Sequence, residues 1–294
     1  MTNGTYHIPA LLQPVIDSLQ VSPGKRYIDA TLGGGGHTRE IIKRGGIVLG
    51  IDQDSDALSY VQENFKFEIL NLKLKTAQGN FRNIHTIAKE NKFEAVSGIL
   101  YDLGVSSNQL DVSGRGFTLR LDEPLDMRMN KNSTLTAYEV VNTYSEEELT
   151  EIFLKYGEEE KAGKVAERIR ETRKNKKIET TKELVAVIEE VIKRQGMMHP
   201  ATKIFQAIRI EVNEELISIK EGLLGGINLL MENGRLCVIS FHSLEDRIIK
   251  QQFDKWETRG MGRILTNKPL IANEEELAKN MRARSAKLRV FEKK

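Results

Sequence analysis

Residues 31–40 read TLGGGGHTRE, in which four consecutive glycines are followed by a histidine. The preceding RYID, residues 26–29, is typical of a short strand, and the following REIIKRG, residues 39–45, is typical of a short helix. A strand that enters a helix through glycines brings bare backbone close to a small ligand, because no Cβ stands in the way. This stretch therefore predicts an α/β sheet with a ligand site at its first turn.

The same alternation continues outward from the glycines. Strand-like and helical patterns follow one another through GIVLGIDQD, LKLKTAQGNF and AVSGILYDLG, as in a parallel sheet covered on both faces. Residues 113–217 are mostly helical and rich in charge, after which two helices, the strand-like GRLCVISF and the alternating SAKLRVFEK complete the pattern. We predict a Rossmann-like α/β domain, residues 1–112 and 218–294, that carries an inserted helical domain. Because ligands of open α/β sheets bind beyond the carboxyl ends of the strands, we expect the insertion to cover the site.

The composition narrows the class of protein. A chain of 294 residues has room for one large domain or two modest ones, and its net charge of +2 means that any basic surface must be local. The single cysteine excludes a disulfide framework and fits a reducing compartment. We see neither a signal peptide nor a run of about 20 apolar residues, so we expect a cytoplasmic protein without a membrane segment. The sequence indicates no metal site and leaves open whether the chain forms a homodimer.

The spacing of the glycines selects among nucleotide-binding turns. A dinucleotide fingerprint, G-x-G-x-x-G, fails because its third glycine would fall on Thr38, and the Gly-Lys-Ser/Thr end of a P-loop is absent. The pattern D-x-G-x-G-x-G of class I S-adenosylmethionine-dependent methyltransferases fits Asp29, Gly33 and Gly35, with Thr31 in place of the first glycine. We therefore predict an S-adenosylmethionine site, with a tight turn that binds no ligand as the alternative.

The ends of the later strands add polar groups at the same edge. Asp52 ends the second strand about twenty residues after the glycines, where a carboxylate can bind the two ribose hydroxyls. It could instead cap the next helix, although Asp54 or Ser55 could do so equally well. Phe81, after the third strand, could lie against adenine or could be an ordinary core aromatic. Asp102 ends the fourth strand, where the substrate should arrive, and a carboxylate there is seldom needed for packing.

Several longer motifs resemble one family. DATLGGGGH, YDLGVSSNQLD, RGFT followed by PLDMRM, HPATKIFQAIRIEVNEEL, SFHSLEDR and RARSAKLR resemble signatures of the bacterial small-subunit (16S) ribosomal RNA cytosine-N4 methyltransferases. The match runs from HIPALL, at residue 7, to the last strand. It departs from the family at MMHP, at Ile204 and at NMRARS.

The resemblance implies a Rossmann-like methyltransferase domain with an inserted helical substrate domain. It implies methylation of the exocyclic amine of one cytosine in the decoding region, with small-subunit RNA or the assembled subunit as partner. By this resemblance the cofactor contacts fall on Gly35, Gly36, His37, Asp52, Phe81, Asp102 and Gln109.

The chemistry of amine methylation agrees with the residues present. Methylation at cytosine C5 normally uses a cysteine, but Cys237 lies mid-strand and is best interpreted as a structural thiol. An amine needs no covalent nucleophile, and transfer gains chiefly from positioning. Amine methyltransferases generally carry D/N-P-P-Y/F after the fourth strand, whereas here Asp102 is followed by Leu-Gly-Val, which keeps the acidic acceptor but lacks the aromatic partner.

Two segments could hold the base near Asp102. His242, after the fifth strand, could orient a group or relay a proton, or could be a hydrogen-bonded turn histidine. Ser243 and Asp246 are expected to cap the following helix as a capping-box-like pair. The resemblance places Asp126 and Arg128 near the substrate, although a structural salt bridge accounts for them equally well.

Two basic runs predict contact with RNA phosphates. A rival hypothesis for both is a solvated surface, and rival functions are an RNA-binding assembly factor with a vestigial fold or a methyltransferase of a non-RNA substrate. The first run lies in the insertion and consists of Arg168, Arg170, Arg173, Lys174, Lys176 and Lys177. The second lies in the tail and consists of Arg282, Arg284, Lys287 and Arg289.

Overall fold

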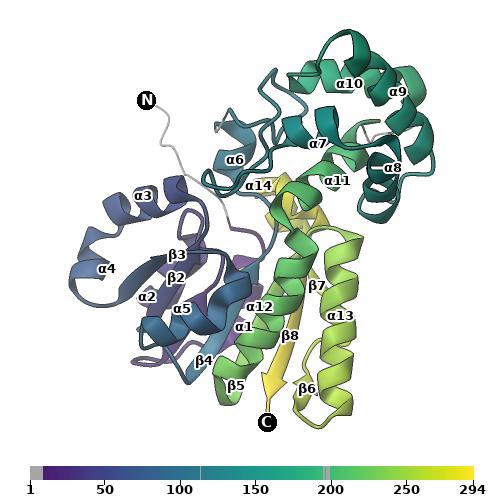
Figure 1. The fold of residues 1–294 in the computed structure, drawn as a ribbon. Coiled ribbons are helices and arrows are strands. Elements are labelled where there is room, and N and C mark those ends of the chain that lie inside the picture. Colours follow the sequence, from purple (N-terminus) through teal and green to yellow (C-terminus); the bar gives the residue numbers. More distant parts are fainter. Residues whose placement is uncertain (1–8, 113, 195, 197–198) are drawn as a thin grey trace. The chain divides into compact units, whose positions relative to one another are not determined.

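The computed structural model describes residues 9–112, 114–194, 196 and 199–294 (Figure 1). The first two residues of HIPALL and the two methionines of MMHP therefore lie outside the described residues. The chain divides into two compact units, which we call the sheet unit, Met1–Ser106 with Leu216–Lys294, and the helical unit, Ser107–Glu215. The predicted insertion, 113–217, has nearly the bounds of the helical unit. No helix in the described part of the chain is both long and apolar enough to cross a membrane.

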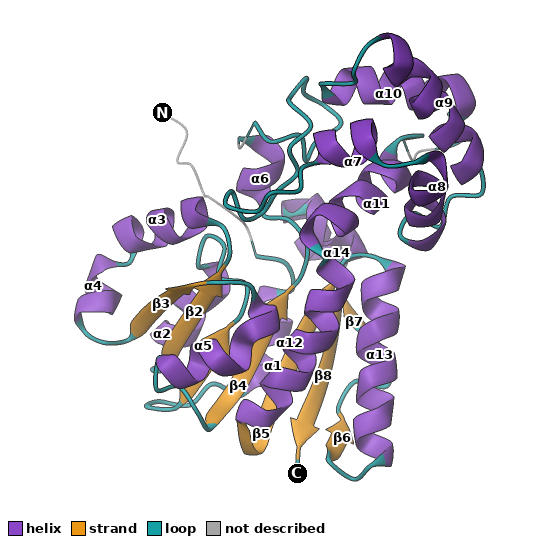
Figure 2. Cartoon of the chain, in the orientation of Figure 1, coloured by secondary structure: helices purple, strands orange, loops and turns teal. Residues whose placement is uncertain are grey.

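The sheet unit is built on a mostly parallel sheet of order β3-β2-β1-β4-β5-β8-β6, with β7 paired to β8 (Figure 2). Strands β1 to β5 run parallel, and β8 is antiparallel to β5, β6 and β7. The predicted Rossmann-like class I sheet is thus confirmed. The strands are β1 (Arg26–Asp29), β2 (Ile47–Asp52), β3 (Leu74–Gln78), β4 (Val96–Asp102), β5 (Leu230–Ser240), β6 (Gly262–Ile264), β7 (Leu270–Ile271) and β8 (Lys287–Lys293).

Helices cover both faces of this sheet, as the buried runs of its strands require. One core lies under α5, α12 and α13, which stand in front of the sheet in Figure 1. The other lies under α1, α2 and α3 and includes the wholly buried Cys237. The helices of this unit are α1 (Leu12–Leu19), α2 (Gly36–Lys43), α3 (Ser55–Asn64), α4 (Lys66–Leu70), η1 (Phe81–Asn83), α5 (Ile84–Glu90), α12 (Glu215–Leu229), α13 (Ser243–Thr258), α14 (Glu274–Lys279) and η2 (Met281–Ser285).

The helical unit has an apolar core of its own, formed by the inward faces of its helices. Three of these helices begin with a capping box, in which a Ser or Thr and a Glu three residues later bind each other's backbone N–H. The sequence thus fixes where α7, α8 and α10 start. The helices are α6 (Ser107–Asp111), α7 (Ala137–Thr143), α8 (Glu146–Lys155), α9 (Ala162–Asn175), α10 (Thr181–Val191) and α11 (Thr202–Asn213).

Two short strands were missed by the sequence analysis. β6 and β7 have three and two residues, too few for the period-2 pattern to show. Both pair with β8, and β6 lies at the edge of the sheet. They extend the sheet at β8 and do not change the edge formed by the carboxyl ends of the parallel strands, where we expect the ligand.

Candidate functional site

Three carboxylates end three adjacent strands. Asp52, Asp29 and Asp102 are the last residues of β2, β1 and β4, which are neighbours in that order and run parallel. The carboxyl ends of parallel strands meet at one edge of the sheet. The chain reverses its order across the sheet between β1 and β4, and open α/β sheets bind ligands at such a switch point.

Asp29 fastens the glycine turn to the sheet. Its side chain is 1% exposed and accepts hydrogen bonds from the Thr38 hydroxyl, at 2.7 Å, and from the Thr31 amide, at 3.3 Å. Burial raises the pKa of Asp29 to about 6, because it outweighs these two bonds. The sequence analysis matched Asp29 to the motif but overlooked Thr38, whose short polar side chain in the first turn of α2 was the available signal.

The glycines of the turn serve different purposes. Gly33 has a φ of +49°, and a Cβ placed there would be in ordinary contact with the Thr31 carbonyl oxygen at 3.9 Å, so this glycine is not crowded by the protein. A Cβ on Gly35 would lie 2.7 Å from the Phe65 ring, and one on Gly36 would lie 2.9 Å from Pro9. The protein's own packing therefore requires Gly35 and Gly36, while Gly33 leaves room for a ligand against the backbone.

Asp52 holds the turn and still has free acceptor capacity. One of its oxygens accepts from the Gly33 amide at 2.7 Å and the other from the Asp54 amide at 2.9 Å. An ionised carboxylate has about four lone-pair sites, so two remain for the hydroxyls of a ribose. Asp54, as expected, caps α3 by accepting from the Asp56 amide. Burial raises the pKa of Asp52 to about 6, with the charges of Asp54 and Asp29 adding to the effect against the two amide bonds.

Asp102 is joined to the turn by its backbone and approached by a histidine. Its amide donates to the Thr31 hydroxyl at 2.6 Å, and its carboxylate, 11% exposed, lies 3.7 Å from Nδ1 of His37. Burial, followed by the charges of Asp29 and Glu245, holds the pKa of Asp102 well above its ordinary value. His37 itself is buried, with its Nε2 3.1 Å from the Ala10 carbonyl oxygen.

Phe81 and Gln109 complete the predicted cofactor set. The half-buried ring of Phe81 packs edge-on against Tyr101, with 5.5 Å between ring centroids, and against α12, where a Cβ on Gly222 would come within 2.7 Å of it. This packing suits the core-aromatic interpretation, and a contact with adenine stays a prediction. Gln109 is buried on α6, in the helical unit, so its part in the cofactor site also stays a prediction.

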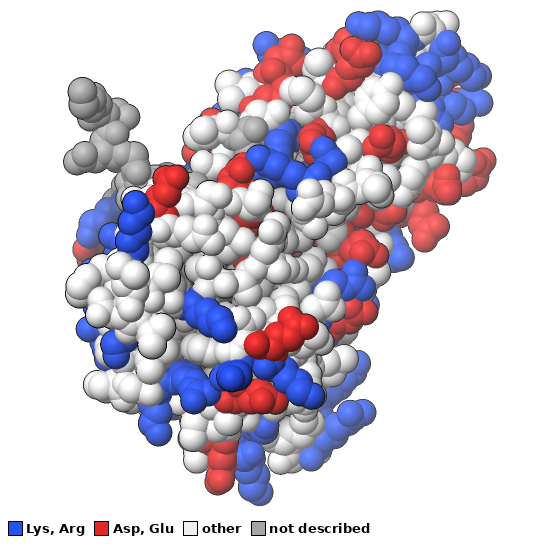
Figure 3. Space-filling model, turned by 60° about the vertical axis from the view of Figure 1, so that its left-hand side comes forward, with Lys and Arg blue, Asp and Glu red and all other residues white. Residues whose placement is uncertain are grey.

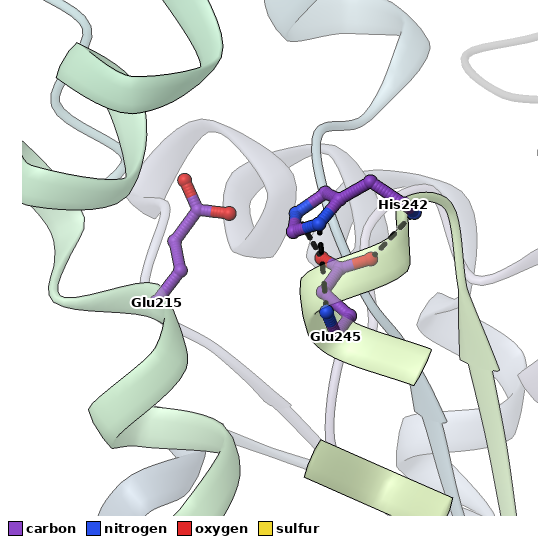
Figure 4. A group of neighbouring side chains, drawn as sticks. All are labelled: Glu215, His242 and Glu245. Carbon is purple, nitrogen blue, oxygen red and sulfur yellow. Dashed lines mark hydrogen bonds and ion pairs between the residues drawn. The ribbon is translucent and has the colours of Figure 1, made fainter. Parts of the chain in front are cut away.

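His242 caps a helix (Figure 4). Its Nδ1 accepts from the Glu245 amide at 3.4 Å, while the Glu245 carboxylate accepts from the amides of Phe241 and His242. Its Nε2 lies 3.3 Å from the same carboxylate. Both ring nitrogens thus face groups of the helix's first turn, as expected for a turn histidine, and the proton relay stays a prediction.

The expected capping pair of Ser243 and Asp246 is wrong by one residue. Ser243 is already the first helical residue, and Asp246 binds Arg289 at 2.6 Å and lies 3.7 Å from Lys287. Histidine is outside the usual N-cap set, so the sequence pointed to the neighbouring serine. Glu215, also drawn in Figure 4, ends the helical unit and forms an ion pair with Arg209 at 2.8 Å.

In the helical unit, Asp126 and Arg128 form the salt bridge that the sequence allowed. Two nitrogens of Arg128 bind the two carboxylate oxygens at 2.7 and 2.8 Å, and a third donates to the carbonyls of Lys131 and Ser133. Although burial opposes it, this pairing holds the pKa of Asp126 below its ordinary value. The pair shapes its own loop, and contact with substrate stays a prediction.

Most cations of the basic run on α9 have structural partners. Arg170 pairs with Glu146 at 2.8 Å, Arg173 donates to the carbonyls of Val141 and Tyr144, and Lys177 donates to the Asn142 carbonyl. Lys174, in contrast, is exposed and forms no hydrogen bond or ion pair within the described part of the chain. Figure 3 shows Lys and Arg gathered where α9 and α10 lie, with acidic side chains among them. The α9 run is therefore partly a structural network.

The sequence was then compared with known proteins. The model of the MraW methylase family matches residues 4–294, which is nearly the whole chain. The chain belongs to this family. Proteins named ribosomal RNA small subunit methyltransferase H are similar to it along almost their entire length. The protein of Fusobacterium nucleatum is 44% identical, over 98% of this chain and 97% of the relative. That of Clostridium botulinum is 45% identical, over 98% of both. That of Bacteroides fragilis is 42% identical, over 99% of this chain and 98% of the relative.

Asp52 should make cofactor binding depend on pH. If its carboxylate binds the ribose, Asp52→Ala removes charge-assisted hydrogen bonds worth about 1.5–3 kcal/mol, or about 10- to 150-fold in affinity. Because the ionised form is required and the pKa is about 6, affinity should fall as the pH drops through 6, by up to about tenfold per pH unit. Titration calorimetry with S-adenosylhomocysteine from pH 5 to 8 measures both effects. Glu63→Gln, exposed on α3, is the control, and an Asp52→Ala variant with unchanged affinity would refute the assignment.

Arg173 and Lys174 are adjacent and should separate structure from RNA binding. Arg173→Ala removes two hydrogen bonds to backbone carbonyls and should lower the free energy of unfolding by about 1–3 kcal/mol. Lys174→Ala should change stability by less than about 0.5 kcal/mol, yet reduce the slope of RNA affinity against log salt by about 0.7–0.9. Denaturation and RNA binding at several salt concentrations test this, and an unchanged slope for Lys174→Ala would place the RNA path elsewhere.

Proposed function

We propose that this protein transfers a methyl group from S-adenosylmethionine to the exocyclic N4 amine of a cytosine in the decoding region of small-subunit ribosomal RNA, in the cytoplasm. The observation that carries the proposal is the cluster of Asp29, Asp52 and Asp102 at the switch point, beside the uncrowded Gly33, in a member of the MraW methylase family.

The residues at the sheet edge fit the cofactor. Asp52 retains two acceptor sites for the ribose hydroxyls, and Gly33 offers backbone that no side chain of the protein crowds. Asp29 acts on the cofactor only indirectly, since its bonds to Thr31 and Thr38 hold the turn in place. S-adenosylmethionine, when bound, supplies an electrophilic sulfonium methyl group.

The protein's contribution to transfer is orientation and an acceptor for the amine hydrogens. The exocyclic nitrogen must present its lone pair in line with the methyl group, which requires that this lone pair turn out of conjugation with the ring. Asp102, at the end of β4, offers carboxylate oxygens that can accept from the amine and hold it in that orientation. A target base within folded RNA must leave its stack to reach such a site.

The rival functions fit less well. A vestigial fold that only binds RNA would not need to keep the Asp52 carboxylate bound to the glycine turn, yet that arrangement is intact. Lys174 in the helical unit is exposed, as a contact with RNA phosphates requires. We infer that the helical unit contacts RNA through such exposed cations, and that Asp126 and Arg128 act near the substrate by keeping their loop in shape.

The proposal is tested by mapping the product. Wild-type protein, labelled S-adenosylmethionine and small subunits, or the naked RNA, should give label at N4 of a single cytosine. Asp102→Ala should lower the rate by about 10²-fold or more, while Asp254→Asn, exposed on α13, should not change it. Label at carbon, or on protein alone, would contradict the proposal.

Cys237 should have no part in the reaction. Its thiol is wholly buried on β5, and burial raises its pKa far above the ordinary value, so it cannot act as a thiolate near neutral pH. Cys237→Ala should cost about 1–3 kcal/mol of stability but leave turnover within a few-fold at temperatures where it is folded. A covalent adduct between this cysteine and RNA, detected by mass spectrometry, would show that the reaction is carbon methylation instead.

A further inference from the structure

The imidazole of His37 is fixed in one tautomer by the N-terminal segment. His37 lies in the first turn of α2, and its Nε2 is 3.1 Å from the carbonyl oxygen of Ala10. A carbonyl can only accept, so Nε2 must carry the hydrogen. Because both residues are nearly inaccessible to water, at 4% and 3% exposed, a water molecule is a poor substitute for this bond. The lone pair of the neutral ring is therefore on Nδ1.

That lone pair faces Asp102. Nδ1 lies 3.7 Å from Oδ2 of Asp102, which is within ion-pair range but beyond a hydrogen bond. A neutral Nδ1 and an ionised carboxylate are both acceptors and cannot bind each other. A single added proton, on either atom, allows a hydrogen bond between them. A small movement could then shorten the distance from Nδ1 to Oδ2 to about 2.8 Å.

The surroundings favour that extra proton. Asp29 on β1 and Glu245 on α13 direct negative charge at Asp102, and its burial further disfavours the ionised form. The imidazole of His37, on α2, lies 3.7 Å from this carboxylate. A proton delivered to Asp102 is therefore stabilised between the two side chains.

We propose that Asp102 and His37 form a proton-sharing pair that accepts the proton released when the amine is methylated. This inference rests on the proposed function. The amine lone pair forms the new N–C bond as the methyl–sulfur bond of the sulfonium breaks and its electron pair goes to sulfur. An N–H bond of the methylated amine then breaks, its electron pair stays on nitrogen, and its proton goes to an oxygen of Asp102. The proton is then shared with Nδ1 of His37, which becomes an imidazolium that donates to Ala10 and Asp102 and later releases the proton to water. His37 is thus a positioning residue that acts through Asp102.

The first test needs neither cofactor nor RNA. Nitrogen-detected NMR of the full chain with labelled histidine should show His37 as the Nε2–H tautomer. In Asp102→Asn the imidazolium loses the carboxylate that lies 3.7 Å from Nδ1, so the titration of the ring followed by NMR should move to lower pH. His85, exposed on α5, is the internal control and should not change. A His37 pKa that is the same in both proteins would overturn the pair.

The second test measures transfer in single turnovers at saturating cofactor. His37→Gln should lower the transfer rate at saturating cofactor by about 10- to 100-fold and shift the acid limb of its pH profile, whatever its effect on cofactor affinity. A profile that superimposes on wild type would give His37 only the role of clamping the N-terminal segment. If wild-type protein methylates no small-subunit RNA, the proposed function fails, whereas the NMR titration still decides whether the pair shares a proton.

Discussion

Three carboxylates at the ends of adjacent strands repel one another in a region that water hardly enters, and the rest of the site is arranged around that repulsion. Asp29 accepts from a hydroxyl and an amide, Asp52 accepts from two amides, and the imidazole of His37 lies beside Asp102. Thr31 and Gly33 in the turn after β1, and Thr38 in the first turn of α2, supply most of these hydrogen bonds. Stabilising the charges and shaping the glycine turn are therefore one and the same set of contacts.

The sequence alone placed part of this arrangement at one edge of the sheet. The alternation of strands and helices predicts β1 to β5, because buried parallel strands leave a strong apolar signal. Strand ends then bring Asp52 and Asp102 to one edge without any knowledge of side-chain contacts. What the sequence could not supply is which atoms meet. The bond from Thr38 to Asp29 and the contact between His37 and Asp102 depend on the path of a turn whose glycines allow many conformations.

The basic run on α9 is a sequence pattern whose role could not be predicted from the sequence alone. A cluster of arginines in the sequence predicts an anion site only if the side chains point into solvent. Here Arg173 donates to a backbone carbonyl at the end of α7, and Arg170 forms an ion pair with an acidic side chain. A guanidinium with five donors can satisfy backbone carbonyls as well as phosphates, so composition alone does not separate the two uses. The position of the cap on α13 failed for a similar reason: histidine took a role that serine fills more often.

The helical unit interrupts the sheet between β4 and β5, which are hydrogen-bonded neighbours although more than a hundred residues separate them. During synthesis on the ribosome, at about 5–20 residues per second, β4 therefore waits of the order of ten seconds for its partner. Throughout that interval its open edge could pair with another nascent chain. The helical unit has a separate core, so its packing does not depend on the pairing of β4 with β5.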